Sequence, residues 1–298
     1  MDIVKLKSNL LLLLTSIIWG TTFVAQSIGA EFVGPLAFNA GRGFFAMTFL
    51  LAVCLLKPRN REAGKAEAAP RKLLIKGGIL CGCLMFVANI LQQTGIALTS
   101  VGKSGFITAL YVVLVPVFGI FLKSGTTLKI WISVALATAG LYLLCAGERI
   151  TIAPGDLLTL LCAAAFAVYI LAVDRFAGRV DVVWLSFVQF ATLFVLSSIG
   201  AFIFEPTPVE LLLRAAVPVI YAGVLSSGIA YTFQMMAQRH TDPTSASLIM
   251  SLESVFALLA GMIFLQQYLS GREIIGCVVM FASIILSQLP ERRRGVGR

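Results

Sequence analysis

The stretch TSASLIMSLESVFALLAGMIFL, residues 244–265, decides the fold class. It contains 22 residues, of which Glu253 alone is charged. A helix rises about 1.5 Å per residue, so this stretch can cross a bilayer core that is about 30 Å thick. We therefore predict that it forms a membrane-spanning helix.

Apolar runs of similar length fill most of the remaining chain. Of the 298 residues, 59% are hydrophobic and 12% are charged, and the mean hydropathy is +0.96. A soluble protein of this length carries roughly 25% charged residues, so soluble, disordered and fibrous classes are excluded. We predict an all-α membrane protein with ten transmembrane helices. The other nine lie at residues 6–28, 35–56, 73–98, 104–122, 128–146, 154–173, 182–204, 211–236 and 272–289.

The distribution of lysine and arginine predicts the orientation. With the N-terminus in the cytoplasm, 18 of these residues fall on the inner side and four on the outer side, and Arg42 lies within a span. Positive residues concentrate in cytoplasmic loops, so both termini are expected in the cytoplasm of a multi-pass cell (inner) membrane protein. The longest linker, residues 57–72, is expected there too. The net charge of +9 then reflects topology, and no nucleic-acid partner is expected.

The two halves of the chain look alike. Residues 97–108 resemble 237–249, and residues 114–118 resemble 252–256, although the spacing between the two segments differs. A repeat of five helices must insert the second time with opposite orientation. We predict a 5+5 inverted repeat, residues 1–149 and 150–298, within a single integral membrane domain. Such carriers bind substrate near the bilayer midplane, between the repeats.

Three segments carry a resemblance to a known family: Ile18-Trp19-Gly20-Thr21-Thr22-Phe23, Phe38-Asn39-Ala40-Gly41-Arg42 and Leu252-Glu253-Ser254-Val255. The chain resembles the EamA-type branch of the drug/metabolite transporter (DMT) superfamily over essentially its whole length. The resemblance implies a ten-helix, exporter-like carrier of small metabolites, often amino acids or amphipathic drugs. Ser254 replaces the proline usual in the family, and no histidine lies in the third span, so an aromatic amino-acid substrate is not carried over.

Two charged residues within the spans are candidates for coupling or substrate binding. Glu253 lies nine residues into its span, which places it about 14 Å deep and close to the bilayer middle. A charge there costs about 2.5–3.5 kcal/mol and normally faces a cavity or a partner. Arg42 is its natural partner, at a depth that differs by roughly 6 Å. A structural ion pair, or snorkelling of Arg42 toward the headgroups, remains the alternative.

Polar and aromatic residues within the spans are candidates for the substrate site. Trp19 and Gln26 share one helix face with Thr22 and Phe23, and the third span carries a polar patch at Asn89, Gln92 and Gln93. Helix packing and interhelical hydrogen bonds are the alternative for each of them. The substrate-binding candidates are Trp19, Gln26, Asn89, Gln93, Tyr111, Tyr169, Tyr231 and Gln234, with Gln189 as a weaker one near the counterpart of Arg42.

These patterns favour a transporter over an enzyme. His240 is the one histidine, and neither a metal-ligand motif nor a paired intramembrane carboxylate is visible, so no metal or cofactor is expected. We expect a secondary transporter that exports small amphipathic metabolites by alternating access, with amino acids as first candidates and proton coupling left open. Its partners are a small-molecule substrate and the lipid bilayer, and no obligate protein partner is evident. The alternatives are a multidrug or organic-cation exporter and a non-transporting membrane scaffold or sensor.

Overall fold

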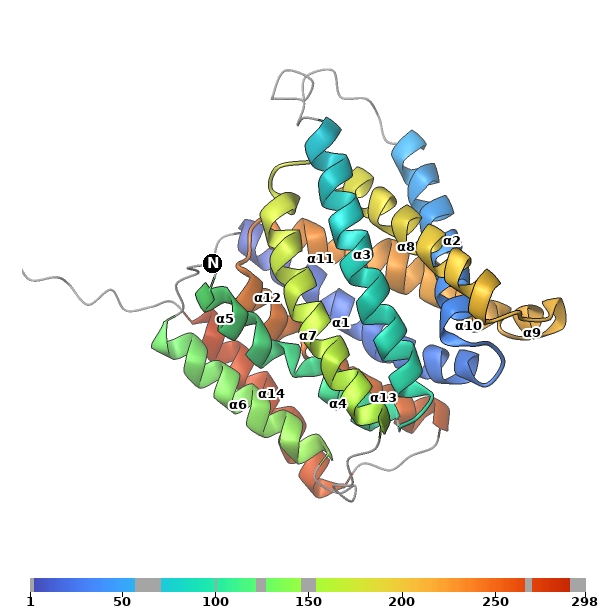
Figure 1. Ribbon diagram of the computed structural model, residues 1–298. Coiled ribbons are helices and arrows are strands. Elements are labelled where there is room, and N and C mark those ends of the chain that lie inside the picture. The colour runs from blue at the N-terminus through green and yellow to red at the C-terminus, as the bar shows by residue number, and fades with distance from the viewer. Residues whose placement is uncertain are drawn as a thin grey trace, which may run out of the picture.

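The computed structural model describes residues 3–56, 71–99, 101–121, 127–145, 154–265 and 270–289, and these are helices joined by short turns (Figure 1). Nine stretches of these residues are long and apolar enough to cross a membrane, and the shorter apolar helix Leu128–Leu143 adds a tenth. The predicted all-α membrane fold is confirmed. Most of the linker 57–72 and the arginines near the C-terminus lie outside the described residues.

Ten segments correspond to the predicted spans, and several consist of more than one helix. The first half contains α1 (Ile3–Ala30), α2 (Pro35–Leu56), α3 (Arg71–Ile96), α4 (Val101–Ala109) followed by α5 (Tyr111–Phe121), and α6 (Leu128–Cys145). The second half contains α7 (Pro154–Ala177), α8 (Val182–Phe204), the short α9 (Val209–Arg214), α10 (Ala216–Tyr221) continued by the π-helix η1 (Ala222–Ala230) and α11 (Tyr231–Gln238), α12 (Pro243–Met250) followed by α13 (Glu253–Leu265), and α14 (Gly271–Gln288).

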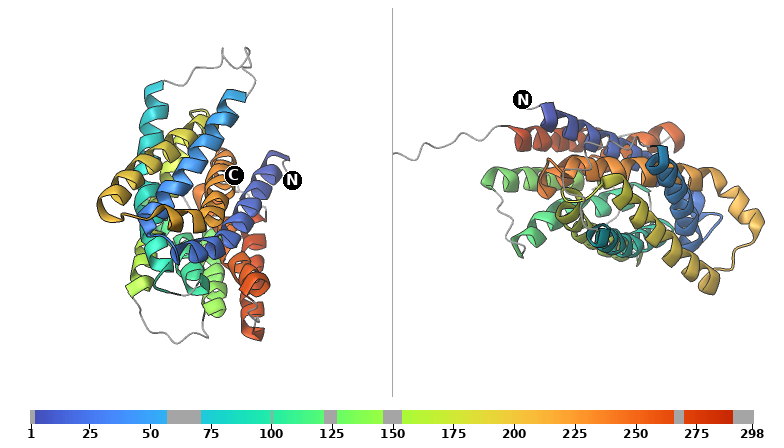
Figure 2. Two further views of the ribbon diagram at one scale, coloured as in Figure 1. Left: turned by 90° about the vertical axis from the view of Figure 1, so that its right-hand side faces the viewer. Right: turned by 90° about the horizontal axis from the view of Figure 1, so that it is seen from above.

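The contacts between the two halves are symmetric: a contact of one helix with a helix of the other half has a counterpart in which the halves are swapped. The second helix of each half packs against the other, α2 on α8, and so do the fifth helices, α6 on α14. The contact of α3 with α7 corresponds to that of α11 with α1, and the contact of α1 with α13 corresponds to that of α7 with α4. The views of Figure 2 show segments of both halves interleaved throughout the bundle.

The ninth span is not one continuous helix, contrary to our expectation for residues 244–265. It breaks at Ser251 and Leu252, where the N–H of Leu252 donates to the carbonyl of Ile249 at 3.2 Å and tightens the turn. Glu253 therefore begins α13 instead of lying in the middle of a helix. The fourth span breaks in the same way at Leu110, so both breaks occur at equivalent places in the two halves.

The eighth span also differs from its predicted bounds of 211–236. Leu211 belongs to the separate helix α9, and the span itself begins at Ala216. Pro218 is the third residue of α10, where a missing N–H costs little, so it does not kink the middle of the span. Pro116, in contrast, lies inside α5.

Glycines let α3 approach α8 closely. A Cβ on Gly78 would lie 2.5 Å from Val188, and one on Gly82 would lie 2.5 Å from Thr192 and 2.7 Å from the carbonyl oxygen of Gln189. Side chains at either position would force the helices apart. The GxxxG spacing of these two residues thus allows the close helix approach that is typical of such pairs in membranes.

The outside of the bundle is apolar. Phe202, Phe121 and Val217 are each more than three-quarters exposed, and many other large hydrophobic side chains also face outward. A soluble monomer rarely exposes so much contiguous apolar surface. Among lipid tails the same surface carries no cost.

Candidate functional site

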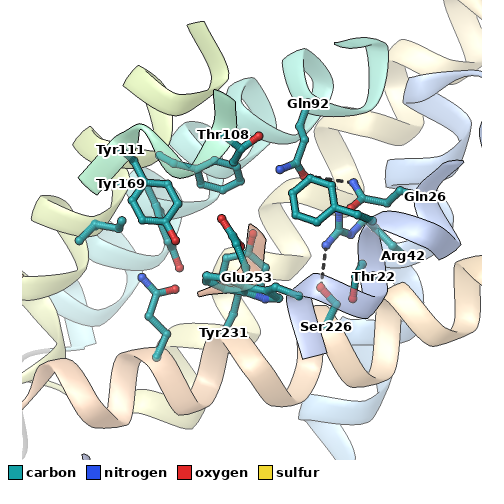
Figure 3. Close-up of a pocket in the computed structure, with 15 residues that line it drawn as sticks. Thr22, Gln26, Arg42, Gln92, Thr108, Tyr111, Tyr169, Ser226, Tyr231 and Glu253 are labelled. Atoms are coloured by element: carbon teal, nitrogen blue, oxygen red, sulfur yellow. Dashed lines mark hydrogen bonds between the residues drawn. The ribbon is translucent and has the colours of Figure 1, made fainter. Parts of the chain in front are cut away.

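A cavity lies inside the bundle, between helices of the two halves (Figure 3). The space between its wall atoms is narrow: it totals about 400 Å³ with open solvent included, and the centre of a water-sized sphere can occupy only about 20 Å³ of it. Both halves contribute to its wall, as expected for a site between two repeats. The lining residues are Trp19, Thr22, Phe23, Gln26, Arg42, Gln92, Thr108, Tyr111, Phe166, Tyr169, Ile170, Ser226, Tyr231, Gln234 and Glu253.

Glu253 projects into this cavity from the first residue of α13 (Figure 3). It is only 3% exposed, and its Oε1 atom is buried without a hydrogen-bond partner. The hydroxyl of Tyr111 lies close enough to the carboxyl group to interact with it as a weak hydrogen bond, although neither the hydroxyl nor Oε1 has a partner of ordinary hydrogen-bond geometry. The start of a helix favours a negative charge, which partly offsets the cost of burial. Glu253 is therefore a buried acceptor with capacity for a ligand or a proton.

Arg42 lines the same cavity but does not pair with Glu253, contrary to our expectation. Its Nε donates to Ser227 Oγ at 3.0 Å, one terminal nitrogen donates to Asn89 Oδ1 at 2.9 Å, and the other donates to Ser226 Oγ at 3.4 Å. The guanidinium thus joins α2 to α3 and η1. Its fork of donors is occupied by neutral partners, so the two charges occupy separate parts of the cavity (Figure 3).

Aromatic rings form much of the wall beside Glu253. Tyr231 is their centre, with ring centroids 4.6 Å from Trp19, 6.0 Å from Tyr169 and 5.6 Å from Phe190. Tyr231 also interacts electrostatically with both Arg42 and Glu253. The indole N–H of Trp19 is buried without a partner. The wall therefore offers aromatic faces and an unpaired donor close to a carboxyl group.

A cluster of three glutamines joins α1 to α3 at one end of the cavity. The Nε2 of Gln26 donates to Gln92 Oε1 and Gln93 Oε1, both at 3.1 Å, and Gln93 Nε2 donates to the backbone oxygen of Gln26 at 3.0 Å. Figure 3 shows Gln26 and Gln92 at the end of the cavity opposite to Tyr111 and Tyr169.

A second amide cluster joins α11 to α7. Gln234 Nε2 donates to Gln238 Oε1 at 2.9 Å, and Gln238 Nε2 donates to the carbonyl of Ile170 at 3.1 Å. Gln234 and Ile170 both line the cavity, while the Oε1 atom of Gln234 is buried without a partner.

The structure brings most of the predicted site residues to one cavity. Asn89 and Gln93 lie behind the wall, where they bind Arg42 and Gln26. Gln189 is also outside the lining, where it accepts from the Tyr169 hydroxyl at 3.1 Å. The remaining candidates line it: Trp19, Gln26, Arg42, Tyr111, Tyr169, Tyr231, Gln234 and Glu253.

Sequence reasoning did not select several of the lining residues. Ser226 accepts a hydrogen bond from Arg42 at the cavity. It lies in the π-helix η1, and such segments occur often at functional sites, but the π-helix is visible only in the structure. Phe166 and Ile170 look like ordinary apolar helix residues, and no local signal distinguishes them. The described residues contain no cluster of three or more potential metal-ligating His, Cys, Asp or Glu side chains.

The sequence pattern of the EamA-like transporter family matches residues 6–146 and again residues 153–289. The chain belongs to the EamA-like transporter family. It is thus a multi-pass membrane transporter of the drug/metabolite type and not an enzyme, and the resemblance to the EamA-type branch is confirmed.

Two relatives named as transporters agree with membership of the EamA-like family, and a solved structure shares the fold. An uncharacterized transporter of Archaeoglobus fulgidus is 29% identical over 96% of this chain and 87% of its own length. The uncharacterized transporter YwfM of Bacillus subtilis is 28% identical over 96% of this chain and 95% of its own length. A protein of known crystal structure superposes with a TM-score of 0.74 over 94% of this chain and 96% of its own, at 20% sequence identity. That last likeness concerns the fold.

Proposed function

We propose that this protein is a secondary transporter that exports small amphipathic metabolites, amino acids first among them, by alternating access. The observation that carries the proposal is the cavity lined by both halves, which holds a buried carboxyl group without a hydrogen-bond partner on Oε1. Charged residues inside a membrane are costly and mark transport pathways. The exchange of helix contacts between halves supports a 5+5 inverted repeat, residues 1–149 and 150–298.

Glu253 is proposed to bind the ammonium group of the cargo. An acceptor beside the rings of Trp19 and Tyr231 suits a cation, because the faces of aromatic rings attract positive charge. Glu253 has a second possible role as the carrier of a driving proton, because burial favours the neutral form of a carboxyl group. Arg42 is proposed to hold α2, α3 and η1 together at the site.

The membrane orientation is proposed from the charge bias. Asn9 near the start of α1 donates to Gln288 at the end of α14 at 3.1 Å, so these two helix ends lie on one face. We assign this face to the cytoplasm because lysine and arginine concentrate on it. The protein would then lie in the cell (inner) membrane with both termini inside.

A second candidate function is export of organic cations that lack a carboxylate. The arginine fork of Arg42 is engaged by Asn89, Ser226 and Ser227, and therefore offers a carboxylate less than an unpaired arginine would. Glu253 and the rings beside it need only a positive group.

Counterflow in proteoliposomes tests both candidates. One set of vesicles is loaded with a mixed amino-acid pool and a second set with the matching amines that lack the carboxylate, and uptake of the labelled form of each pool is measured in its own set. Counterflow of amino acids supports the first candidate, and counterflow of the amines alone supports the second. Failure of both, with folded protein in the vesicles, would contradict the proposal.

The variant Glu253→Gln assigns the role of the carboxyl group. Loss of exchange with retained folding indicates cargo binding, whereas exchange that survives while proton-driven uptake is lost indicates proton coupling. Glu205→Gln is the matched control, since it makes the same chemical change outside the cavity and keeps an oxygen that can accept from the start of α2. Loss of folded protein in Glu253→Gln would point to a structural role.

A further inference from the structure

We propose that the two amide clusters are the two gates of the transport pathway: Gln26, Gln92 and Gln93 close one end of the cavity, and Gln234 and Gln238 with the Ile170 carbonyl close the other. This inference rests on the alternating-access function proposed above, and it names the groups whose hydrogen bonds must break at each step.

The first cluster separates the cavity from a pocket at one face of the protein. Gln26 and Gln92 line the cavity, whereas Gln93 lines a pocket formed by residues 30–35 and Ala97. This pocket lies where α1 and α3 end. Because Gln93 both donates to and accepts from Gln26, separation of α1 from α3 would connect the two spaces.

The second cluster lies toward the opposite face. The start of α1 and the end of α11 meet at another pocket, lined by Val4, Lys7, Met236, His240 and their neighbours. The end of α11 is therefore near the start of α1, whereas Gln26 is near its end. Gln238 is the last residue of α11, so its bond to Ile170 closes α11 on α7 at this second face.

The two clusters occupy equivalent places in the two halves. The first joins the first and third spans of the first half, α1 and α3, and the second joins the first and third spans of the second half, α7 and α11. A carrier built from repeats changes access when the halves exchange conformations. If the hydrogen bonds of one cluster break while those of the other stay formed, and the reverse follows, the two halves exchange conformations. The hydrogen bonds of both clusters are formed in the present structure.

Amide side chains suit this task for an energetic reason. Hydrogen bonds between helices in membranes contribute modestly, so each can break and re-form during a cycle. A glutamine side chain is also uncharged, so no charge has to be moved between water and the protein interior when the cluster opens or closes. The loss of one such bond corresponds to a shift of about 3- to 20-fold between closed and open states.

A reporter cysteine in the cavity tests the gates. Thr22→Cys is introduced into a background in which the six native cysteines are replaced, and the rate of its modification by a small membrane-impermeant thiol reagent is measured from each face. Gln93→Met should raise the rate about 10- to 400-fold from the face where α1 ends, because two interhelical bonds are lost. Gln238→Met should raise it from the opposite face.

Gln288→Met is the matched control. It also removes a glutamine that bonds a second helix, but its partner is Asn9 at the helix ends, outside the cavity, so neither rate should change. Should Gln93→Met fail to fold, Gln93→Asn replaces it, because the shorter amide cannot reach Gln26 and the same face should open.

The outcomes separate this inference from the proposed function. Opposite effects of Gln93→Met and Gln238→Met support the gates even if none of the tested amino acids or amines shows counterflow. Rates that match the control in both variants, or that rise equally from both faces, overturn the gates even if counterflow is normal.

Discussion

Replacement of Arg42 by lysine should destabilise the protein more than replacement by methionine. Arg42 is 1% exposed and makes three hydrogen bonds to α3 and η1. A lysine ammonium is a single point and cannot reproduce the planar fork, so at least two of these bonds are lost. Methionine loses all three bonds but also removes the buried charge.

The magnitudes favour methionine over their whole range. Interhelical hydrogen bonds in membranes contribute about 0.6 kcal/mol on average and about 1.7 kcal/mol at most, so lysine costs about 1–3.5 kcal/mol and methionine about 2–5 kcal/mol. The methionine variant also lacks the buried charge, whose removal stabilises it by about 2.5–3.5 kcal/mol; the lysine variant keeps the charge and gains nothing. Arg42→Met should therefore be more stable than Arg42→Lys by about 1–3 kcal/mol.

The assay is reversible unfolding in lipid bicelles. The fraction of folded protein is measured as denaturant is increased, and the free energy of unfolding is obtained from that curve. The wild type and both variants are measured in the same lipid. A lysine variant as stable as wild type, or more stable than the methionine variant, would refute the reasoning. It would mean that the charge of Arg42, and not its three hydrogen bonds, stabilises this site.

Three further changes test the packing and the helix ends. Gly82→Leu should prevent α3 from packing on α8, because even a Cβ at this position would lie 2.5–2.7 Å from α8 atoms. Size-exclusion profiles in detergent should show aggregated protein. The control Gly178→Ala, which has open space around it, should stay monodisperse. Glu205→Leu should lower the unfolding free energy by about 1 kcal/mol, since its carboxylate accepts from two N–H groups at the start of α2, and an unchanged denaturation midpoint would contradict this. Lys103→Met should lower the free energy of unfolding by about 1.5–3 kcal/mol, because it removes the 2.6 Å ion pair and leaves the charge of Asp156 without this ammonium group. The double variant with Asp156→Leu should regain part of that stability in chemical unfolding.

Some features of the site followed from helical spacing. Trp19 and Gln26 lie seven residues apart on one face of α1, and the structure places both on the cavity. Tyr231 and Gln234 behave in the same way on α11. Asn89 and Gln93 share a helix face, yet they bind different partners because that face meets α2 and α1 at different heights. Spacing along one helix cannot reveal that difference.

The sequence by itself determined that the chain crosses a membrane many times and belongs to the EamA-like transporters. Length, apolar content and the scarcity of charge are local properties, and each segment crosses the bilayer if it is long and apolar enough by itself. The tertiary structure alone decided what Arg42 binds, where the ninth span breaks and which glutamines meet. These outcomes depend on residues far apart in the chain, such as Arg42 and Ser227, which are 185 positions apart. Their hydrogen bonds form only when folded helices bring them within about 3 Å, and no local pattern encodes that distance.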